Sequence, residues 1–186
     1  MNEPLPAAET LFEGDWLRLV RRGRWEYAER AHDPRGMAVV IVATTPAGEL
    51  LFVEQARAAT GSRTVELPAG LVGDTDAAES LQQSARRELV EETGWEPASV
   101  EILAVGPTSP GMSNERAAFV RASGLARVGA GGGDAHEAIV VHAVPLADAP
   151  RWLCAMRDAG FEVDLKVWSG LWLAQHAIDG TPLAAR

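Results

Sequence analysis

The first 36 residues contain two stretches in which apolar and polar side chains alternate, which is typical of strands that bury one face. The stretches are residues 15–20 and 25–30, and the polar residues 21–24 between them include a glycine. Two alternating runs around a short polar turn predict a β-hairpin. Residues 37–43 are almost continuously apolar and β-branched, which predicts a strand buried on both faces. Residues 49–55 predict another strand after a Pro-Ala-Gly turn.

A helix is predicted over residues 77–93, because apolar side chains recur along one face of this segment. The recurring residues are Leu81, Ala85 and Leu89. Asp76 followed by Glu79 resembles a capping box that would start the helix, with Asp in place of Ser or Thr. Gly94 can adopt the left-handed conformation that ends a helix. Ahead of this segment, residues 67–70 break regular structure.

The remainder of the chain mixes strands with helices. Further strands are predicted at about 100–105, 116–122 and 138–144, and further helices at about 147–158 and 164–178. Residues 129–134 are too rich in glycine to be regular. Because the elements do not follow a strict βαβ rhythm, the pattern predicts an α/β fold with a mixed sheet between helices.

Length and composition fit one compact domain with a small extension, at 186 residues and 47% apolar residues. The formal net charge is −9, from 26 acidic and 17 basic residues, which argues against nucleic acid and anionic membranes as partners. The single cysteine, Cys154, lies in an apolar run and gives no sign of an oxidising compartment. No signal peptide or membrane-length apolar stretch is present, so we expect a soluble cytoplasmic protein.

Three glutamates gather on the predicted helix. Glu88 and Glu92 lie one turn apart, about 6 Å between Cβ atoms, and Glu91 borders the same face. Like charges at this spacing destabilise a helix, and hard divalent cations prefer carboxylate oxygens as ligands. A solvated acidic face is the ordinary interpretation of a Glu-Glu pair alone. Arg87 lies beside the cluster, where it could hold one carboxylate by two hydrogen bonds.

The spacing of these residues resembles the Nudix box, which reads Gly, five residues, Glu, seven residues, Arg-Glu-aliphatic-any-Glu-Glu-any-Gly-aliphatic. The matching residues are Gly73, Glu79, Arg87, Glu88, Leu89, Glu91, Glu92 and Gly94. Trp95 departs from the final aliphatic position. In one subgroup of the family that this box defines, the Gly of a Pro-Ala-Gly segment usually opens the box. Here that residue is Gly70, three positions too early, so we interpret a short insertion before the helix.

Two further segments, residues 66–70 and 109–115, resemble those of the ADP-ribose pyrophosphatase subgroup, and the resemblance covers about residues 12–178. It implies a Nudix-type α/β/α sandwich with a mixed β-sheet and an N-terminal β-hairpin extension. The extension would be residues 1–36, used for dimerisation and base binding, and the Nudix hydrolase domain would be residues 37–186. In relatives the hairpin reaches the other subunit, which implies a homodimer.

The resemblance also implies a metal site. The carbonyl of Ala69 would join Glu88 and Glu92 as a ligand of two or three Mg²⁺ or Mn²⁺ ions, and Glu91 would support them. Arg87 and Glu91 would belong to the catalytic set. A Nudix base often comes from a mobile loop before the next strand, here residues 129–137, where a glycine-rich lid is physically reasonable.

Glu137 is the predicted base or third metal ligand. Asp134 is the other carboxylate near the end of the loop, and some relatives are acidic where this chain has Ala135. His136 could titrate near neutrality, although an exposed histidine at such a position is usually incidental.

Four residues are implied in substrate binding. Arg57 matches an arginine that contacts phosphate in the family. Trp16 and Trp25 occupy hairpin positions where some relatives hold adenine between two aromatic rings, and each stacking contact is worth about 1–3 kcal/mol. Glu115 would face the terminal ribose.

These observations predict metal-dependent hydrolysis of the diphosphate in a nucleoside diphosphate linked to another group, with ADP-ribose giving AMP and ribose 5-phosphate. Hydrolysis of another nucleotide sugar, such as a GDP-sugar, or of a damaged nucleotide is an alternative, because the box binds only the diphosphate. A non-catalytic nucleotide-sugar sensor is a second alternative. Such proteins should lose one or more of the box glutamates, and this chain keeps them all. A structural or interaction domain would leave the spaced motif unexplained.

Overall fold

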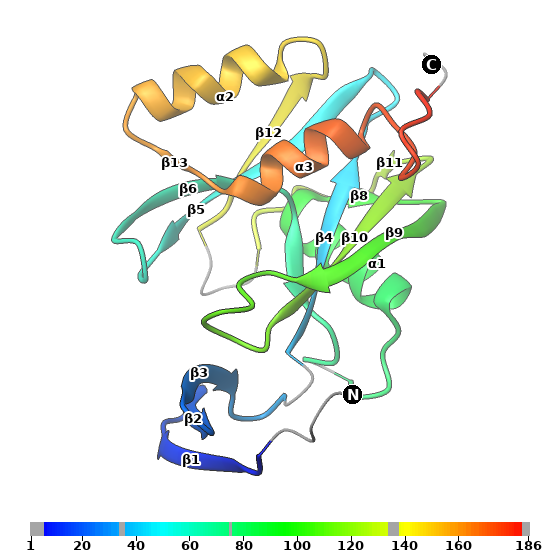
Figure 1. Ribbon diagram of the computed structural model, residues 1–186. Coiled ribbons are helices and arrows are strands. Elements are labelled where there is room, and N and C mark those ends of the chain that lie inside the picture. Colours follow the sequence, from blue (N-terminus) through cyan, green and yellow to red (C-terminus); the bar gives the residue numbers. More distant parts are fainter. Residues whose placement is uncertain (1–5, 34–35, 75, 134–137, 184–186) are drawn as a thin grey trace. The chain divides into compact units, whose positions relative to one another are not determined.

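The computed structural model describes residues 6–33, 36–74, 76–133 and 138–183 (Figure 1). The chain divides into two compact units. The first contains Met1–Ala38 and Val105–Ala117, and the second contains Val39–Ala104 and Ala118–Arg186. None of the helices in these described ranges is both long and apolar enough to span a membrane.

The first unit is built on a three-stranded antiparallel sheet of β1 (Ala8–Glu13), β2 (Leu17–Arg22) and β3 (Trp25–Arg30), in that order. Strands β2 and β3 are the predicted hairpin, which is confirmed. Strand β1 was not predicted, because five of its six residues are exposed and leave no alternation to detect. The segment before β10 (Arg116–Ser123) joins this unit, since Ala28 donates its N–H to the Met112 carbonyl at 2.8 Å.

The second unit contains two four-stranded sheets. One has the order β7 (Ala69–Leu71), β4 (Met37–Ala43), β10 (Arg116–Ser123) and β9 (Ser99–Pro107). The other has the order β12 (Val140–Pro145), β5 (Glu49–Arg57), β6 (Ser62–Glu66) and β13 (Glu162–Val163). A two-stranded sheet pairs β8 (Trp95–Glu96) with β11 (Ala126–Arg127). Strand β13 runs parallel to β6 whereas β5 and β12 pair antiparallel, so the predicted mixed sheet is confirmed.

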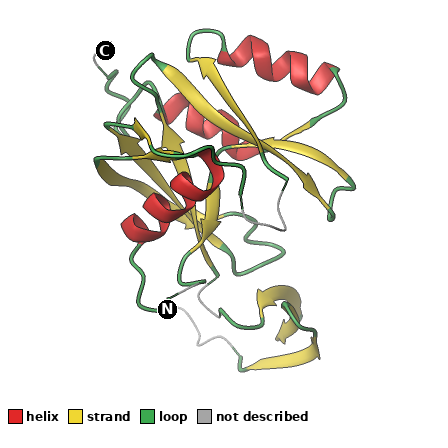
Figure 2. Ribbon diagram, turned by 180° about the vertical axis from the view of Figure 1, so that it is seen from behind, coloured by secondary structure: helices red, strands yellow, loops and turns green. Residues whose placement is uncertain are grey.

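In the part of the chain that the structure describes, three helices pack on these sheets: α1 (Leu81–Thr93), α2 (Ala149–Asp158) and α3 (Leu165–Leu173) (Figures 1 and 2). Helix α2 covers the β12–β5 face, where the Trp152 ring lies 5.2 Å from Phe52. Helix α3 is shorter than predicted. Arg121 donates to the carbonyls of Leu173 and His176 at its C-terminal end, at 2.8 and 2.9 Å.

Helix α1 begins later than predicted and with a different cap. Its N-cap is Ser80, which accepts from the Gln83 N–H at 3.3 Å, while the Gln83 side chain accepts from the Ser80 N–H at 2.9 Å. The capping box predicted from Asp76 and Glu79 is therefore wrong. The Glu79 carboxylate is held by Arg87 instead, and Asp76 accepts from the Ala78 N–H in a turn before the helix.

Candidate metal and diphosphate site

Helix α1 carries the predicted carboxylates on a firmly anchored frame. Leu89 and Ala85 on its apolar stripe are fully buried, as predicted. Gly94 ends the helix in the left-handed conformation, with φ of 72°, and donates to the Val90 carbonyl at 2.9 Å. A helix fixed along its length and at its end can hold side chains in one geometry, which a metal site requires.

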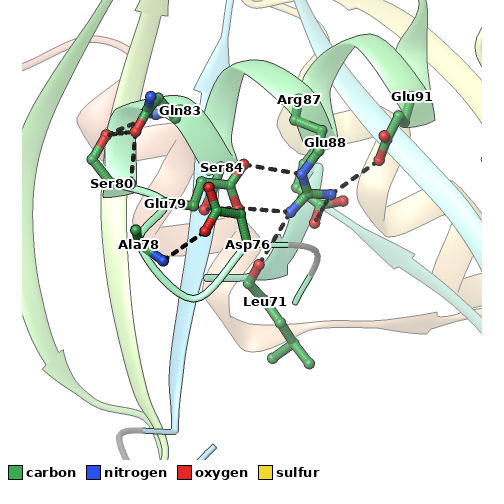
Figure 3. A network of polar contacts seen from close by, with 10 residues as sticks. All are labelled: Leu71, Asp76, Ala78, Glu79, Ser80, Gln83, Ser84, Arg87, Glu88 and Glu91. Carbon is green, nitrogen blue, oxygen red and sulfur yellow. Dashed lines mark hydrogen bonds and ion pairs between the residues drawn. The ribbon is translucent and has the colours of Figure 1, made fainter. Parts of the chain in front are cut away.

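Arg87 joins three of the carboxylates (Figure 3). Its Nε and Nη2 donate to the two oxygens of Glu79, at 3.1 and 3.2 Å. Its Nη1 lies 2.8 Å from Glu88 Oε1 and 3.1 Å from Glu91 Oε2, and its Nη2 also donates to the Leu71 carbonyl at 3.3 Å. The hydrogen bonds to Glu79 raise the pKa of Arg87, against the effect of its burial. Arg87 is thus the central cation of the cluster.

Glu79 is held by a second donor. The hydroxyl of Ser84, which is fully buried, donates to Glu79 Oε2 at 2.7 Å. The hydrogen bonds from Arg87 lower the pKa of Glu79, burial opposes that effect, and the Ser84 bond adds to it. Glu79 therefore stays ionised and keeps Arg87 in place beside Glu88 and Glu91.

Strand β7 lies against the two predicted ligand glutamates. The Ala69 N–H donates to Glu92 Oε2 at 3.1 Å. A Cβ placed on Gly70 would lie 1.9 Å from Glu88 Cδ, so the Glu88 side chain occupies the space beside this glycine. Glu92 is 4% exposed. The structure therefore brings Ala69 close to Glu88 and Glu92, although Ala69 lies about 20 residues before these two glutamates in the chain.

The donor set suits a hard divalent cation, because carboxylate and carbonyl oxygens are the ligands that Mg²⁺ and Mn²⁺ prefer. Arg87 supplies one positive charge against the three carboxylates that it contacts, Glu79, Glu88 and Glu91, so the cluster stays acidic. Among the described residues, no three or more Asp, Glu, His or Cys side chains are arranged to hold a metal ion. The predicted set instead combines Glu88 and Glu92 with the main-chain carbonyl of Ala69, and Glu91 supports them.

The glycine-rich segment is attached to the C-terminal end of α1. The N–H groups of Gly132 and Gly133 donate to the carbonyls of Glu92 and Glu91, at 2.8 and 3.1 Å. Gly131 has φ of 72°, and a Cβ there would lie 2.4 Å from the main-chain carbon of Thr93. Residues 129–133 therefore cap α1, a contact that sequence reasoning missed. The predicted base Glu137, with Asp134, Ala135 and His136, lies outside the described residues, so the base and the moving lid stay predictions.

Arg57 lies at the end of β5 and binds a glutamate that the sequence had not marked. Its Nε and Nη2 donate to Oε1 and Oε2 of Glu66, at 2.7 and 2.8 Å. The Arg57 side chain is 45% exposed, whereas that of Glu66 is 8% exposed. The signal that could have indicated Glu66 is its position at the start of the Glu-Leu-Pro-Ala-Gly segment, on the strand that pairs with β5.

Trp16, Trp25 and Glu115 all belong to the first unit. The two tryptophans are 79% and 62% exposed. They lie at opposite ends of the β2–β3 hairpin, because the Trp16 carbonyl accepts from Ala31 and Trp25 pairs with Arg22. Six residues at about 3.3 Å each correspond to roughly 20 Å between the two ends of an extended hairpin.

Glu115 is held at the Trp16 end of the hairpin. Its Oε2 accepts from Arg30 Nη2 at 2.9 Å, and its Oε1 accepts from the Thr108 hydroxyl at 3.1 Å. Arg30 pairs with Leu17, the residue after Trp16. Glu115 and Trp16 therefore lie near the same end of this unit.

Comparison with family models identifies a NUDIX domain over residues 34–161. The chain is 37% identical over 115 residues to an ADP-ribose pyrophosphatase of Mycobacterium tuberculosis, covering 61% of this chain and 55% of that protein. It is 37% identical over 90 residues to a methanol dehydrogenase activator of Bacillus methanolicus, covering 48% of this chain and 47% of that protein. It is 29% identical over 126 residues to an ADP-ribose pyrophosphatase of Bacillus subtilis, covering 62% of this chain and 63% of that protein.

The matches thus span about half of the length of these relatives. A crystal structure of an ADP compounds hydrolase superimposes with a TM-score of 0.72 at 22% identity, over 91% of this chain and 90% of that one. This similarity confirms the predicted fold class.

Proposed function

The chain belongs to the Nudix family, and on that premise we propose that it is a metal-dependent hydrolase of the diphosphate in a nucleoside diphosphate linked to another group. The observation that carries the proposal is the arrangement of Ala69, Glu88 and Glu92 beside the Arg87 cluster. Every glutamate of the box is present: Arg87 contacts Glu79, Glu88 and Glu91, and Glu92 accepts from the Ala69 N–H. A structural role alone would not need so many carboxylates on one helix.

The residues of the chain have separate roles in the proposed reaction. Glu88, Glu92 and the Ala69 carbonyl would hold the metal ions, and Arg87 fixes the side chains of Glu88 and Glu91. Two or three Mg²⁺ or Mn²⁺ ions, when bound, neutralise the diphosphate and activate a water molecule. Arg57 contacts a phosphate, and Glu137 accepts the proton of the attacking water. A new phosphorus–oxygen bond forms while the bond to the bridging oxygen breaks, which gives AMP and ribose 5-phosphate from ADP-ribose.

ADP-ribose is the substrate that we favour. Two of the relatives are ADP-ribose pyrophosphatases, and exposed tryptophans in the first unit offer flat surfaces for a base. Glu115 would bind the terminal ribose hydroxyls. A GDP-sugar hydrolase would use the same cluster with different base contacts.

We further propose that the protein acts as a homodimer. Large apolar side chains in and beside the sheet of the first unit are exposed and could be covered by a second subunit: Phe12, Trp16, Leu17, Leu19 and Trp25. Because Trp16 and Trp25 lie at opposite ends of the β2–β3 hairpin, we place one ring from each subunit in a two-ring base site.

The test is phosphatase-coupled turnover with Mg²⁺ and with Mn²⁺ on ADP-ribose, ADP-glucose, GDP-mannose, NADH, diadenosine polyphosphates and nucleoside triphosphates. We expect ADP-ribose to be preferred. Glu92→Gln should lose most of the turnover and remain folded, whereas Glu96→Gln, an exposed glutamate just beyond α1, should behave as wild type. Preference for GDP-sugars would support the alternative substrate, and no turnover on any compound would refute the hydrolase proposal.

A further inference from the structure

Two arginine–glutamate pairs cross the β5–β6 hairpin, one on each of its faces. Arg57 of β5 binds Glu66 of β6, and Arg63 of β6 binds Glu54 of β5. The register pairs Val53 with Glu66 and alternates side chains between faces, so Arg57 and Glu66 share one face and Arg63 and Glu54 share the other. The Glu54–Arg63 pair can therefore serve as a control for the Arg57–Glu66 pair in the same hairpin.

The Arg57–Glu66 pair has the geometry of a fixed guanidinium. Two parallel hydrogen bonds of 2.7 and 2.8 Å join the fork of Arg57 to both oxygens of Glu66. Such bidentate pairs define the plane of the arginine as well as its position. Glu66 is the buried partner, and a buried carboxylate that loses its counter-ion is left as a costly uncompensated charge. The pair uses two of the five N–H donors of a guanidinium.

The main chain at both ends of the pair is also fixed. The Arg57 carbonyl accepts from Thr60 and Gly61 in the hairpin turn, at 3.2 and 3.0 Å. Glu66 is three residues before Ala69, whose N–H binds the predicted ligand Glu92. The pair thus connects the predicted phosphate arginine to the strand segment that borders the metal cluster.

We propose that Glu66 is a positioning residue that holds the Arg57 guanidinium in the orientation that binds the substrate diphosphate. This inference rests on the proposed function. The Glu54–Arg63 pair, which instead contacts His142 on the α2 side of the sheet, has no such role.

The effect of removing the Glu66 charge has opposite signs under the two explanations. If Glu66 acted only through its charge, Glu66→Gln would remove a negative charge near the substrate and strengthen the binding of an anion. If Glu66 positions Arg57, the same substitution loosens the guanidinium and weakens binding. The direction of the change in affinity therefore distinguishes a charge effect of Glu66 from positioning of Arg57.

The experiment is calorimetric binding of the α,β-methylene analogue of ADP-ribose in Mg²⁺, because this analogue retains two phosphorus groups and is not hydrolysed. The variants are Glu66→Gln, Arg57→Ala, the double variant and the matched control Glu54→Gln. We expect Glu66→Gln to weaken binding about 10-fold, to have little further effect in the Arg57→Ala background, and to raise KM for ADP-ribose more than it lowers kcat. Glu54→Gln should bind the analogue as wild type.

Unchanged or tighter binding by Glu66→Gln would overturn the inference, as would an equal loss in the Arg57→Ala background or no binding by the wild type. Arg57→Lys provides a second variant should Glu66→Gln fail to fold, because it keeps the charge but cannot form the two parallel bonds. Positioning predicts that Arg57→Lys also weakens binding, and wild-type affinity in this variant would refute it. Failure of the proposed function is separate: the wild type would bind the analogue but turn over no diphosphate.

Discussion

Gly70 shows how one residue without a side chain determines where a carboxylate can lie. A Cβ at this position would be 1.9 Å from Glu88 Cδ and 2.0 Å from its Oε1. The clash is with the end of a flexible side chain, so the main chain need not move. We expect Gly70→Ala to unfold at nearly the wild-type temperature but to lose most of its turnover and weaken its Mg²⁺ dependence, because Glu88 is displaced.

Gly106→Ala is the control for that measurement, since a Cβ on Gly106 meets no atom within 4 Å. It should retain wild-type turnover and Mg²⁺ dependence. Full activity of Gly70→Ala would show that the position of Glu88 beside β7 is unimportant for catalysis.

Glu79 makes the stability of the protein depend on pH. The hydrogen bonds from Arg87 lower its pKa below the ordinary glutamate value of 4.5, although burial acts in the other direction. As pH falls through and below that value, the unfolded chain takes up this proton before the folded chain does, so the free energy of unfolding decreases. At pH values above 4.5, the stabilisation of the folded state by ionised Glu79 is fully present.

Glu79→Gln should therefore reduce the free energy of unfolding near neutral pH and flatten its decrease on acidification. The measurement is urea unfolding of both proteins in EDTA at several values between about pH 6 and pH 3. An identical slope in the two proteins would mean that the Arg87 bonds do not favour the ionised form of Glu79.

The start of α1 can be tested as an element, because the sequence and the structure give different caps. Ser80 bonds reciprocally with Gln83, so Ser80→Ala should destabilise the protein by about 1 kcal/mol, which corresponds to roughly 2–4 °C in Tm for a chain of this size. Asp76 bonds only within the preceding turn, so Asp76→Ala should have a smaller effect in thermal unfolding. The reverse order would support the cap predicted from the sequence.

Elements with a regular hydrophobic pattern were predictable, and short elements were not. The β2–β3 hairpin follows from alternation with a period of two, strand β4 from a continuous apolar run, and the stripe of α1 from a period of 3.6 residues. Strands β8, β11 and β13 have two residues each, which is too short to show any period. The spacing of the carboxylates identified the metal helix, but not the contacts that depend on distant parts of the chain.

Those distant contacts explain what sequence reasoning missed in the site. The glycine-rich segment caps α1 through hydrogen bonds between residues about 40 positions apart, which no local pattern encodes. Glu66 is identified only once β5 and β6 are paired in register. Arg87 was expected to hold one carboxylate by two bonds, and it does so with Glu79.

At the scale of the whole molecule, the net charge of −9 opposes the binding of an anionic substrate. The site can attract an anionic substrate only if local cations offset this negative charge. Arg57, Arg87 and bound metal ions would supply them. The same reasoning assigns base recognition to uncharged surfaces, and the exposed rings of Trp16 and Trp25 are such surfaces.

A composite base site can be tested by mixing two variant dimers that each have a raised KM. If each site uses Trp16 from one subunit and Trp25 from the other, Trp16→Ala and Trp25→Ala should each raise KM for ADP-ribose. In a heterodimer of the two variants, one site has lost both rings and the other keeps both. Random exchange of equal amounts should therefore restore wild-type KM to about one quarter of all sites, by two-fold symmetry. Turnover at low ADP-ribose concentration, measured before and after denaturation and joint refolding, gives this fraction. No gain over the unmixed variants would place both rings in sites built by a single chain, or outside the site altogether.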